Sequence, residues 1–339
     1  MNILITGGSG FIGTNLVREL LKEGHRVVIY DKRRSEFLPD LCIIGDIRDK
    51  ESLNRAMHGV EAVYHLAAEH RDDVRPKSLY YEVNVGGAEN VVYALNKNGA
   101  KRLIFTSTVA LYGLNAEEPD ENYSIRPFND YGLSKQKAEL IFNEWVSNGD
   151  GRCLVIVRPC VIFGEKNRGN VYNLLKQITS KRFIMVGDGK NKKSMGYVLN
   201  LVHFLRMVLD ASPGRHVFNY ADKPDLSMEE LVKIALRAFG DGDRITFRIP
   251  YLVGLLGGYG FDMLAKITKR NYPISSIRIK KFCANTCISG EKLRETGFIA
   301  PFSLAAGLNR MILSEFRTSA VEQFPAGAKV EPKSSPEEI

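Results

Sequence analysis

The chain begins with a glycine-rich turn between an apolar strand and an amphipathic helix, and this pattern restricts the folds that the chain can adopt. The three parts are an apolar run at 2–6, the turn GGSGFIG at 7–13, and apolar residues at helical spacing over 14–22. Gly7 permits a tight turn, Gly10 lets the backbone approach a pyrophosphate, and Gly13 lets helix and strand pack closely. The N-terminus of the helix attracts the anion. The pattern predicts half of a dinucleotide-binding site, and a glycine turn without a nucleotide is the alternative.

The second predicted strand indicates which dinucleotide binds. It covers 26–30 and ends in Asp31. A carboxylate about 20 residues after the glycine turn accepts hydrogen bonds from the adenosine ribose and repels a 2′-phosphate. Asp31 therefore favours NAD over NADP, although Lys32, Arg33 and Arg34 follow directly and act in the opposite direction.

Strands and helices alternate through the first half of the chain. Further strands are expected at 41–44, 61–65, 102–106 and 153–157, with helices at 50–58, 76–98 and 130–146. This order is typical of an α/β fold, a Rossmann-type doubly wound parallel sheet with right-handed crossovers.

The alternation loosens after Pro159, which predicts a smaller C-terminal α+β substrate domain. Its expected elements include a helix at 171–178, a strand at 183–186, and a helix that Ser227 caps, with Glu230 at the capping-box position, and that runs to Phe239. The segment 197–209 is expected to return to the first domain, and a strand is expected at 217–220. We expect an NAD-binding domain of 1–163 and about 190–221, a substrate domain of 164–189 and about 222–317, and a disordered tail at 318–339.

The net charge of +8 is concentrated in one segment, 244–282, which has eight basic residues and one acidic residue, a balance of +7. No nucleic-acid motif accompanies it, so no nucleic-acid partner is expected. The apolar stretch 249–267 lies between the basic clusters and suits an anionic membrane surface. A buried apolar helix with a solvated basic rim is the alternative.

The sequence also carries information about the cellular compartment and about metal binding. The five cysteines are scattered and odd in number, so we expect reduced thiols and no metal site. No apolar run reaches about 18 residues, so no membrane span is expected. The sequence runs directly into a strand, which indicates no signal peptide. We expect a cytoplasmic protein, peripherally associated with the inner face of the cell membrane.

Three side chains near the fifth predicted strand suit proton transfer. Thr108 follows that strand, and Tyr131 and Lys135 lie four residues apart on the next helix, hence on one face. A free phenol has a pKa of about 10, which a nearby cation lowers. Tyr131 could then act as a general base while Thr108 hydrogen-bonds the same substrate hydroxyl. A solvated Tyr/Lys pair is the alternative.

With these motifs in place, the chain resembles the extended short-chain dehydrogenase/reductase family. The matching pieces are Gly7–Gly13, Asp31, Asp46, Leu66-Ala67-Ala68, Asn84, Thr108 with Tyr112-Gly113, Tyr131 with Lys135, and Arg158-Pro159. The resemblance implies bound NAD, with Tyr131 as the base, Thr108 orienting the substrate hydroxyl and Lys135 also holding the nicotinamide ribose. Its implied cofactor contacts are Gly7, Gly10, Phe11, Ile12, Gly13, Asp31, Lys32, Asp46, Ile47, Leu66, Ala67, Ala68, Asn84, Tyr131, Lys135 and Pro159.

The residues after Thr108 separate reaction types within that family. Sugar dehydratases carry two acidic residues there, whereas this chain has Val109 and Ala110. The resemblance therefore implies an isomerase, a sugar 4-epimerase that works through a transient 4-keto sugar with no net redox change. One departure is Asn200, where an Asp is common in the family.

Further segments, at 69–74, 164–177, 193–195 and 257–259, are similar to the branch of the family that acts on a lipid-linked sugar. This implies interconversion of GlcNAc and GalNAc on diphospho-undecaprenol, in O-antigen or other surface polysaccharide assembly. The implied substrate contacts are Glu69, His70, Arg71, Thr108, Arg168 and Asn170. A homodimer is possible. A UDP-sugar 4-epimerase, a hydroxysteroid-type dehydrogenase and a non-catalytic NAD-binding scaffold stay open as alternatives.

Overall fold

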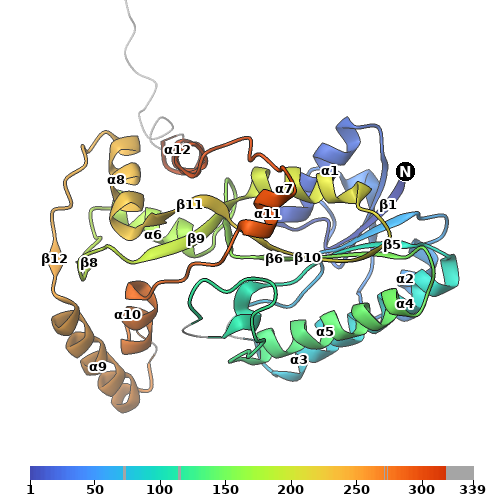
Figure 1. Cartoon of the computed structure of the whole chain (residues 1–339). Helices are drawn as coiled ribbons and strands as arrows, with labels where there is room; N and C mark the ends of the chain where they lie inside the picture. Colours follow the sequence, from blue (N-terminus) through green and yellow to red (C-terminus); the bar gives the residue numbers. More distant parts are fainter. Residues whose placement is uncertain (72–73, 114–115, 271, 273, 318–339) are drawn as a thin grey trace, which may run out of the picture.

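A seven-stranded parallel sheet with the order β10-β6-β5-β4-β1-β2-β3 forms the larger lobe (Figure 1). The computed structural model describes residues 1–317 except 72–73, 114–115, 271 and 273; the predicted tail at 318–339 lies outside the described residues. The strands are β1 (Asn2–Thr6), β2 (Arg26–Asp31), β3 (Cys42–Ile44), β4 (Ala62–His65), β5 (Arg102–Thr106), β6 (Cys153–Pro159) and β10 (Gly214–Tyr220). The predicted doubly wound α/β fold is confirmed.

Helices cover both faces of this sheet (Figure 1). One face carries α1 (Phe11–Lys22) and α7 (Val198–Met207), and the other carries α2 (Lys50–Ala56), α4 (Gly87–Asn98) and α5 (Asp130–Ser147). Successive side chains of a strand point to opposite faces, so Ile3 and Ile5 join one apolar core and Leu4 joins the other. Burial on both faces explains why these strands are almost continuously apolar.

The predicted helix at 76–98 contains a π-helical turn. It consists of α3 (Ser78–Tyr81), the π-turn η2 (Glu82–Gly86) and α4, and it ends at Gly99 in the left-handed conformation. A π-turn inserts one extra residue and rotates the side chains that follow. Asn84 lies within this turn and is buried.

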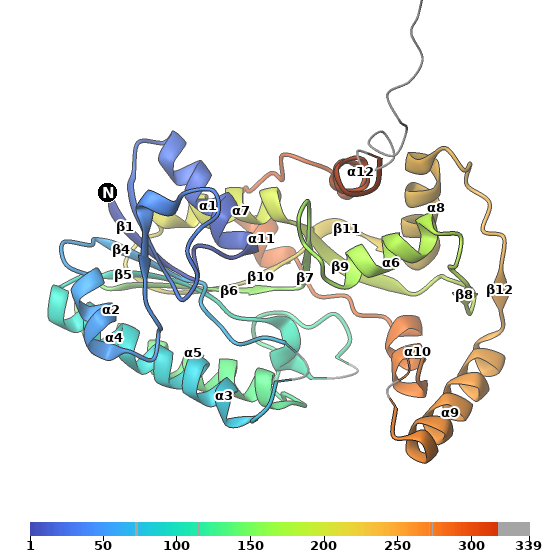
Figure 2. The ribbon, with the colours of Figure 1, turned by 180° about the vertical axis from the view of Figure 1, so that it is seen from behind.

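The smaller lobe has two short sheets (Figure 2). One contains β7 (Val161–Phe163), β9 (Lys192–Tyr197) and β11 (Asp222–Ser227), and the other contains β8 (Met185–Val186) and β12 (Arg248–Ile249). Its helices are α6 (Asn170–Thr179), α8 (Met228–Phe239), α9 (Tyr251–Thr268), α10 (Ser276–Cys283) and α12 (Leu304–Ile312), whereas α11 (Glu291–Glu295) packs against β10 of the large sheet. The predicted capping box of Ser227 and Glu230 is present. The predicted strand at 183–186 is too long, since only two residues pair with the equally short β12.

Short helical turns connect several of these elements. They are η1 (Pro39–Leu41), η3 (Val109–Tyr112), η4 (Val208–Asp210) and the π-turn η5 (Leu313–Arg317). Across the described residues, the structure has no helix long and apolar enough to cross a membrane.

Candidate active site

The glycine turn after β1 leaves the N-terminus of α1 open to an anion. Gly10 is the N-cap of α1 and supplies no side-chain cap, so the first amides of the helix depend on another acceptor. The turn has no room for larger residues: a Cβ on Gly13 would lie 2.5 Å from the Gly8 Cα, and one on Gly7 would lie 2.6 Å from the Ala67 nitrogen. This cradle fits the diphosphate of a dinucleotide.

A cavity of about 730 Å³ opens beside the same helix N-terminus. Its wall includes Gly10 and Phe11, and six basic side chains against three acidic ones. The basic side chains are Arg18, Lys22, Arg33, Arg34, Lys166 and Arg310. The excess positive charge suits phosphate groups. The lining of this cavity does not include Thr108, Tyr131 or Lys135, so the cavity lies apart from the predicted catalytic residues.

The acidic residues of the predicted adenosine region are held by backbone amides and arginine. Asp31 lies at the end of β2, where its carboxylate accepts hydrogen bonds from Ser9 N (3.1 Å) and Arg33 N (3.0 Å). Asp46 accepts a 2.7 Å bond from Arg48 Nη2, which lowers the pKa of its carboxyl. Asn90 donates to the Ile47 carbonyl at 3.0 Å. These contacts fix both loops at the carboxyl ends of the strands, the edge where such folds bind nucleotides.

Thr108, Tyr131 and Lys135 lie where β5 ends and α5 begins. Thr108 is buried, and its Oγ1 accepts a hydrogen bond from Ala110 N at 3.1 Å. Tyr131 and Lys135 occupy the first turns of α5, whose N-cap, Asn129, accepts from Gly132 N. A rigid strand end and a capped helix therefore position the three predicted residues.

The buried position of Lys135 makes the charged form of its side chain unfavourable. It is 2% exposed, and its Nζ lies 4.2 Å from the ring centroid of Phe105. Burial lowers the pKa of Lys135 to about 7, although the nearby Glu139 carboxylate acts in the opposite direction. A nearby anion such as a phenolate would stabilise the charged form of this buried ammonium.

The π-turn connects this helix to the end of β4. Asn84 Nδ2 donates to Ser134 Oγ (2.9 Å) and to the Glu69 carbonyl (3.0 Å), while its Oδ1 accepts from Glu69 N (2.8 Å). Ser134 in turn donates to the Tyr131 carbonyl at 2.8 Å. Asn84 thus holds the segment after β4 at a fixed distance from the turn of α5 that carries Tyr131.

A buried ion pair that the sequence reasoning missed lies one turn below Lys135. Arg158 and Glu139 are 2% and 3% exposed at their side chains and form a bidentate pair, with Nη2 to Oε2 at 2.7 Å and Nε to Oε1 at 3.0 Å. Arg158 also donates to the hydroxyl of Tyr112, which donates to Asn219. The available signal was spacing, since Glu139 lies four residues after Lys135 on the same helix.

One polar atom beside Thr108 has no partner in the described structure. The Ser107 Oγ is buried and unsatisfied there. Buried hydroxyls normally have a hydrogen-bond partner, so a polar group bound at this strand end would satisfy it. Together with the glycine cradle, this orphan oxygen shows that the residues present fit a dinucleotide.

A family model for the NAD-dependent epimerase/dehydratase family matches residues 3–221. The chain belongs to this family. A 4-epimerase of N-acetyl-α-D-glucosaminyl-diphospho-ditrans,octacis-undecaprenol from Escherichia coli O157:H7 is 49% identical over 317 residues, 93% of this chain and 95% of that protein. The predicted family resemblance is therefore confirmed, and NAD is its cofactor.

Two further proteins are similar to this chain over most of their length. A 2-alkyl-3-oxoalkanoate reductase from Stenotrophomonas maltophilia is 30% identical over 335 residues, 92% of this chain and 98% of that protein. The solved structure of a Thermus thermophilus UDP-glucose 4-epimerase in complex with NAD is 22% identical, covers 94% of this chain and 99% of its own, and has a TM-score of 0.71. At this identity, the similarity to the Thermus thermophilus structure shows only that the two proteins share a fold.

The predicted substrate residues of this family member fall in two places. Glu69 is buried at the end of β4 and pairs with Arg71 at 3.1 Å, while His70 is exposed. Arg168 pairs instead with Glu315 at 2.6 Å and stacks on Tyr172, just before Asn170 begins α6. The described contacts do not join the second group to Tyr131, and both groups stay predictions.

The departure at Asn200 has a structural partner. Its Nδ2 donates to Asp222 Oδ2 and to the Phe302 carbonyl, both at 2.8 Å, and its Oδ1 accepts from Phe302 N. Asp222 also accepts from Tyr197 N and Tyr220 OH. An amide can donate to this buried carboxylate, which a second carboxylate at position 200 could do only if protonated.

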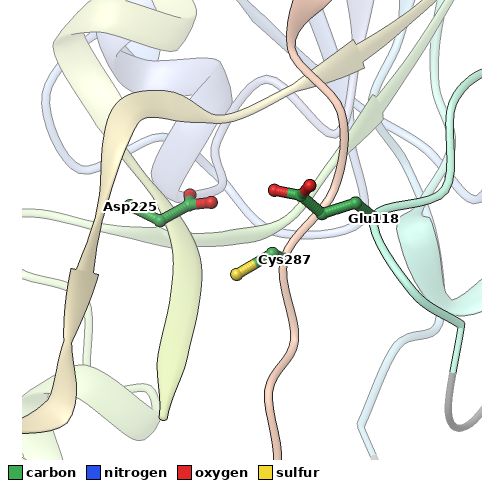
Figure 3. Close-up of side chains that lie close together, drawn as sticks. All are labelled: Glu118, Asp225 and Cys287. Atoms are coloured by element: carbon green, nitrogen blue, oxygen red, sulfur yellow. The ribbon is translucent and has the colours of Figure 1, made fainter. Parts of the chain in front are cut away.

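Three possible metal ligands, Glu118, Asp225 and Cys287, lie close together (Figure 3). Asp225 already accepts from Ser194 Oγ at 2.7 Å and pairs with Lys223 Nζ at 2.6 Å. Burial raises the pKa of the Cys287 thiol to about 11, with Asp225 acting in the same direction. A protonated thiol and a neutralised carboxylate are poor ligands, so this group gives no reason to assign a metal.

Proposed function

We propose that this protein is a 4-epimerase that interconverts N-acetylglucosamine and N-acetylgalactosamine on diphospho-undecaprenol. The observation that carries the proposal is the 49% identity to an enzyme with this substrate over nearly the full length of both chains. The Thr108, Tyr131 and Lys135 arrangement supplies the groups that the chemistry needs. Family membership alone would not select this reaction, because a reductase is also among the relatives.

In the proposed mechanism Tyr131 is the base. Its phenolate accepts the proton of the sugar 4-hydroxyl, and Thr108 orients that hydroxyl through its own side-chain oxygen. Lys135 stabilises the phenolate by charge and holds the nicotinamide ribose. NAD, when bound, accepts the C4 hydride and later returns it. Tyr131 gives the proton back after the 4-keto sugar has turned over, so the product differs only in configuration at C4.

The cofactor would be held by the strand ends already described. The open N-terminus of α1 at Phe11 and Ile12 receives the diphosphate, and Asp31 with Lys32 receives the adenosine ribose. Asp46 and Ile47 flank the adenine. The remaining proposed contacts line the nicotinamide end: Leu66, Ala67, Ala68, Asn84 and Pro159. Their positions at the ends of β4, β6 and the π-turn support this assignment.

Substrate recognition would come from both lobes. We assign Glu69, His70 and Arg71 to the sugar side, and Arg168 and Asn170 to the segment 164–189, which with 222–317 would form the substrate domain. Because the prenyl chain keeps its sugar at a bilayer, the enzyme would work as a peripheral protein at the inner face of the cell membrane, in O-antigen or other surface polysaccharide assembly.

A single comparison tests the substrate. Purified protein is given GlcNAc-diphospho-undecaprenol and UDP-GlcNAc side by side, and the product sugars are identified after mild acid hydrolysis. We expect GalNAc from the lipid-linked substrate at a much higher rate. GalNAc formed only from the nucleotide sugar would make the protein a UDP-sugar 4-epimerase, and net formation of NADH would make it a dehydrogenase.

A further inference from the structure

Helix α9 presents an unusually apolar face to solvent. The side chains of Leu252, Leu256, Met263 and Ile267 are 69%, 69%, 67% and 73% exposed. They recur at intervals of four and seven residues, with the half-exposed Tyr259 between them, and therefore form one stripe along the helix. From Leu252 to Ile267 the helix rises fifteen steps of about 1.5 Å, so the stripe is about 22 Å long. We call these five side chains the α9 stripe.

The opposite face of α9 explains why the stripe points outward. Gly254 and Gly258 are buried, and a Cβ there would lie 2.5 Å from Val186 Cγ1 and 2.8 Å from the Ser276 Cα. The helix therefore packs closely on β8 and α10 through its glycines. Asp262 accepts from Ser276 Oγ at 2.5 Å and from Ser276 N at 3.2 Å, which fixes α10 beside it.

The α9–α10 pair projects from the end of the smaller lobe that lies farthest from β1 and α1. Both views show the two helices side by side and clear of the seven-stranded sheet (Figures 1 and 2). Lys280 Nζ of α10 lies 5.4 Å from the ring centroid of Tyr259, yet each side chain of the α9 stripe keeps about half or more of its surface in solvent. A monomer that leaves such a stripe exposed has a partner for it.

The charge around the stripe indicates which partner. Lys266 and Lys269 lie at the C-terminal end of α9, and Lys280 and Lys281 lie on α10. Within the described part of the chain, none of these four lysines forms an ion pair with an acidic side chain. An apolar stripe flanked by unpaired cations is complementary to an anionic bilayer, which offers acyl chains beneath phosphate groups.

We infer that the α9 stripe enters the acyl boundary of an anionic bilayer while the lysines of α9 and α10 contact its phosphates. This docking surface rests on the proposed function, since a prenyl-linked sugar must be met at a membrane. The stripe is too short and too one-sided to span, so the helix lies in the plane of the interface.

The docking surface is joined to the active site by direct contacts. Lys281 Nζ on α10 lies 5.6 Å from the ring centroid of Phe128, three residues before Tyr131. The end of α10 is fixed to the smaller lobe, because Asn191 donates to the Phe282 carbonyl at 2.8 Å and Lys193 donates to the Lys281 carbonyl at 3.0 Å. Docking would thus bring the segment that carries Phe128 and leads to Tyr131 close to the bilayer surface.

Vesicle sedimentation with matched variants tests this surface. The variant Leu256→Gln/Met263→Gln removes two apolar side chains from the stripe. The control Leu140→Gln/Ile299→Gln changes two apolar residues elsewhere that are 60% and 86% exposed. With phosphatidylglycerol vesicles at low salt, we expect the wild type and the control to pellet and the stripe variant to lose at least tenfold in bound fraction. High salt, or Lys266→Glu/Lys269→Glu, should weaken binding, whereas Lys97→Glu/Lys101→Glu should not.

Turnover of two substrates separates docking from chemistry. The stripe variant should lose about tenfold or more on GlcNAc-diphospho-undecaprenol in vesicles, yet stay within twofold of the wild type on a water-soluble short-chain analogue. Wild-type protein that stays in the supernatant would overturn the docking surface, as would unchanged pelleting of the stripe variant. A stripe that instead holds two copies together, seen as a dimer by light scattering that the variant dissociates, would also overturn it. No turnover of either substrate would refute the proposed function and leave the docking result standing.

Discussion

At the scale of single residues, Tyr131 carries the most direct expectation. Tyr131→Phe removes the proton acceptor and keeps the ring, so we expect turnover to fall roughly 10²- to 10⁴-fold, the usual contribution of a general acid or base. Bound NAD should stay at the wild-type level. Steady-state rates and the cofactor content of the purified variant measure both. Tyr93→Phe on α4 is the matched control, and a Tyr131→Phe enzyme that turned over like this control would exclude Tyr131 as the base.

Asp31 decides between cofactors through its charge. We expect the wild-type protein without cofactor to bind NAD in preference to NADP, and Asp31→Ser to lose roughly 10- to 100-fold in NAD affinity, the value of a hydrogen bond to a charged group. Titration calorimetry with both cofactors measures this. Asp31 also accepts hydrogen bonds from Ser9 N and Arg33 N, so the substitution could disturb the loop itself. As a control, the cofactor-free Asp31→Ser variant should unfold at the same temperature as the cofactor-free wild type. Tighter binding of NADP by the wild type would mean that Arg33 and Arg34 outweigh the carboxylate.

Lys135 links the site to stability. Its pKa of about 7 in the folded protein lies below the value near 10.5 of an unfolded lysine. Between these values the unfolded chain binds more protons, so the folded state gains stability as pH rises from 7 to 10, and the cost of burying the charge is fully present below pH 7. Lys135→Met removes that cost and should abolish most activity.

Thermal unfolding of the cofactor-free proteins at pH 6.5 and 9.5 tests the sign. The midpoint of Lys135→Met minus that of the wild type should be larger at pH 6.5 than at pH 9.5. Lys137→Met, two residues along the same helix, provides the control and should show no such trend. An equal difference at both pH values would show that Lys135 keeps its ordinary pKa when folded.

At the scale of secondary-structure elements, the Arg158–Glu139 pair joins β6 to α5. Removing one partner leaves the other charge buried and unpaired, so Arg158→Met or Glu139→Gln should each cost about 3–5 kcal/mol in the free energy of unfolding. The double variant Arg158→Met/Glu139→Gln should lose less than the sum of the two single losses. Urea unfolding of all four proteins closes the cycle. Additive losses would mean that the two side chains act independently, against their bidentate geometry.

The sequence predicted those elements that local patterns define. The strand–turn–helix at 2–22, the strand end before Thr108 and the face shared by Tyr131 and Lys135 each depend on a few neighbouring residues. The π-turn at Glu82–Gly86 and the partner of Glu139 were missed because both depend on packing between segments distant in sequence. The apolar stretch at 249–267 was found, yet only the glycines packed on β8 and α10 show which side faces outward.

At the scale of the whole molecule, the chain passes repeatedly between the two lobes. It leaves the large sheet after β6, returns at α7, leaves again after β10, and returns at α11, which packs against β10. Asp222, the first residue of β11, accepts hydrogen bonds from Tyr197, Asn200 and Tyr220. The loosened alternation after Pro159 indicated the two-part domains, whereas the place of β10 beside β6 depends on long-range strand pairing that local sequence does not encode.

The late position of β10 has a consequence for synthesis of the chain on the ribosome. β6 pairs with β5 on one side and with β10 on the other, and β10 is made some 55 residues later. Until then β6, whose sequence is CLVIVRP, forms an open edge of nearly continuous apolar residues. We expect this interval to be the stage at which the nascent protein is most prone to aggregate and most in need of a chaperone.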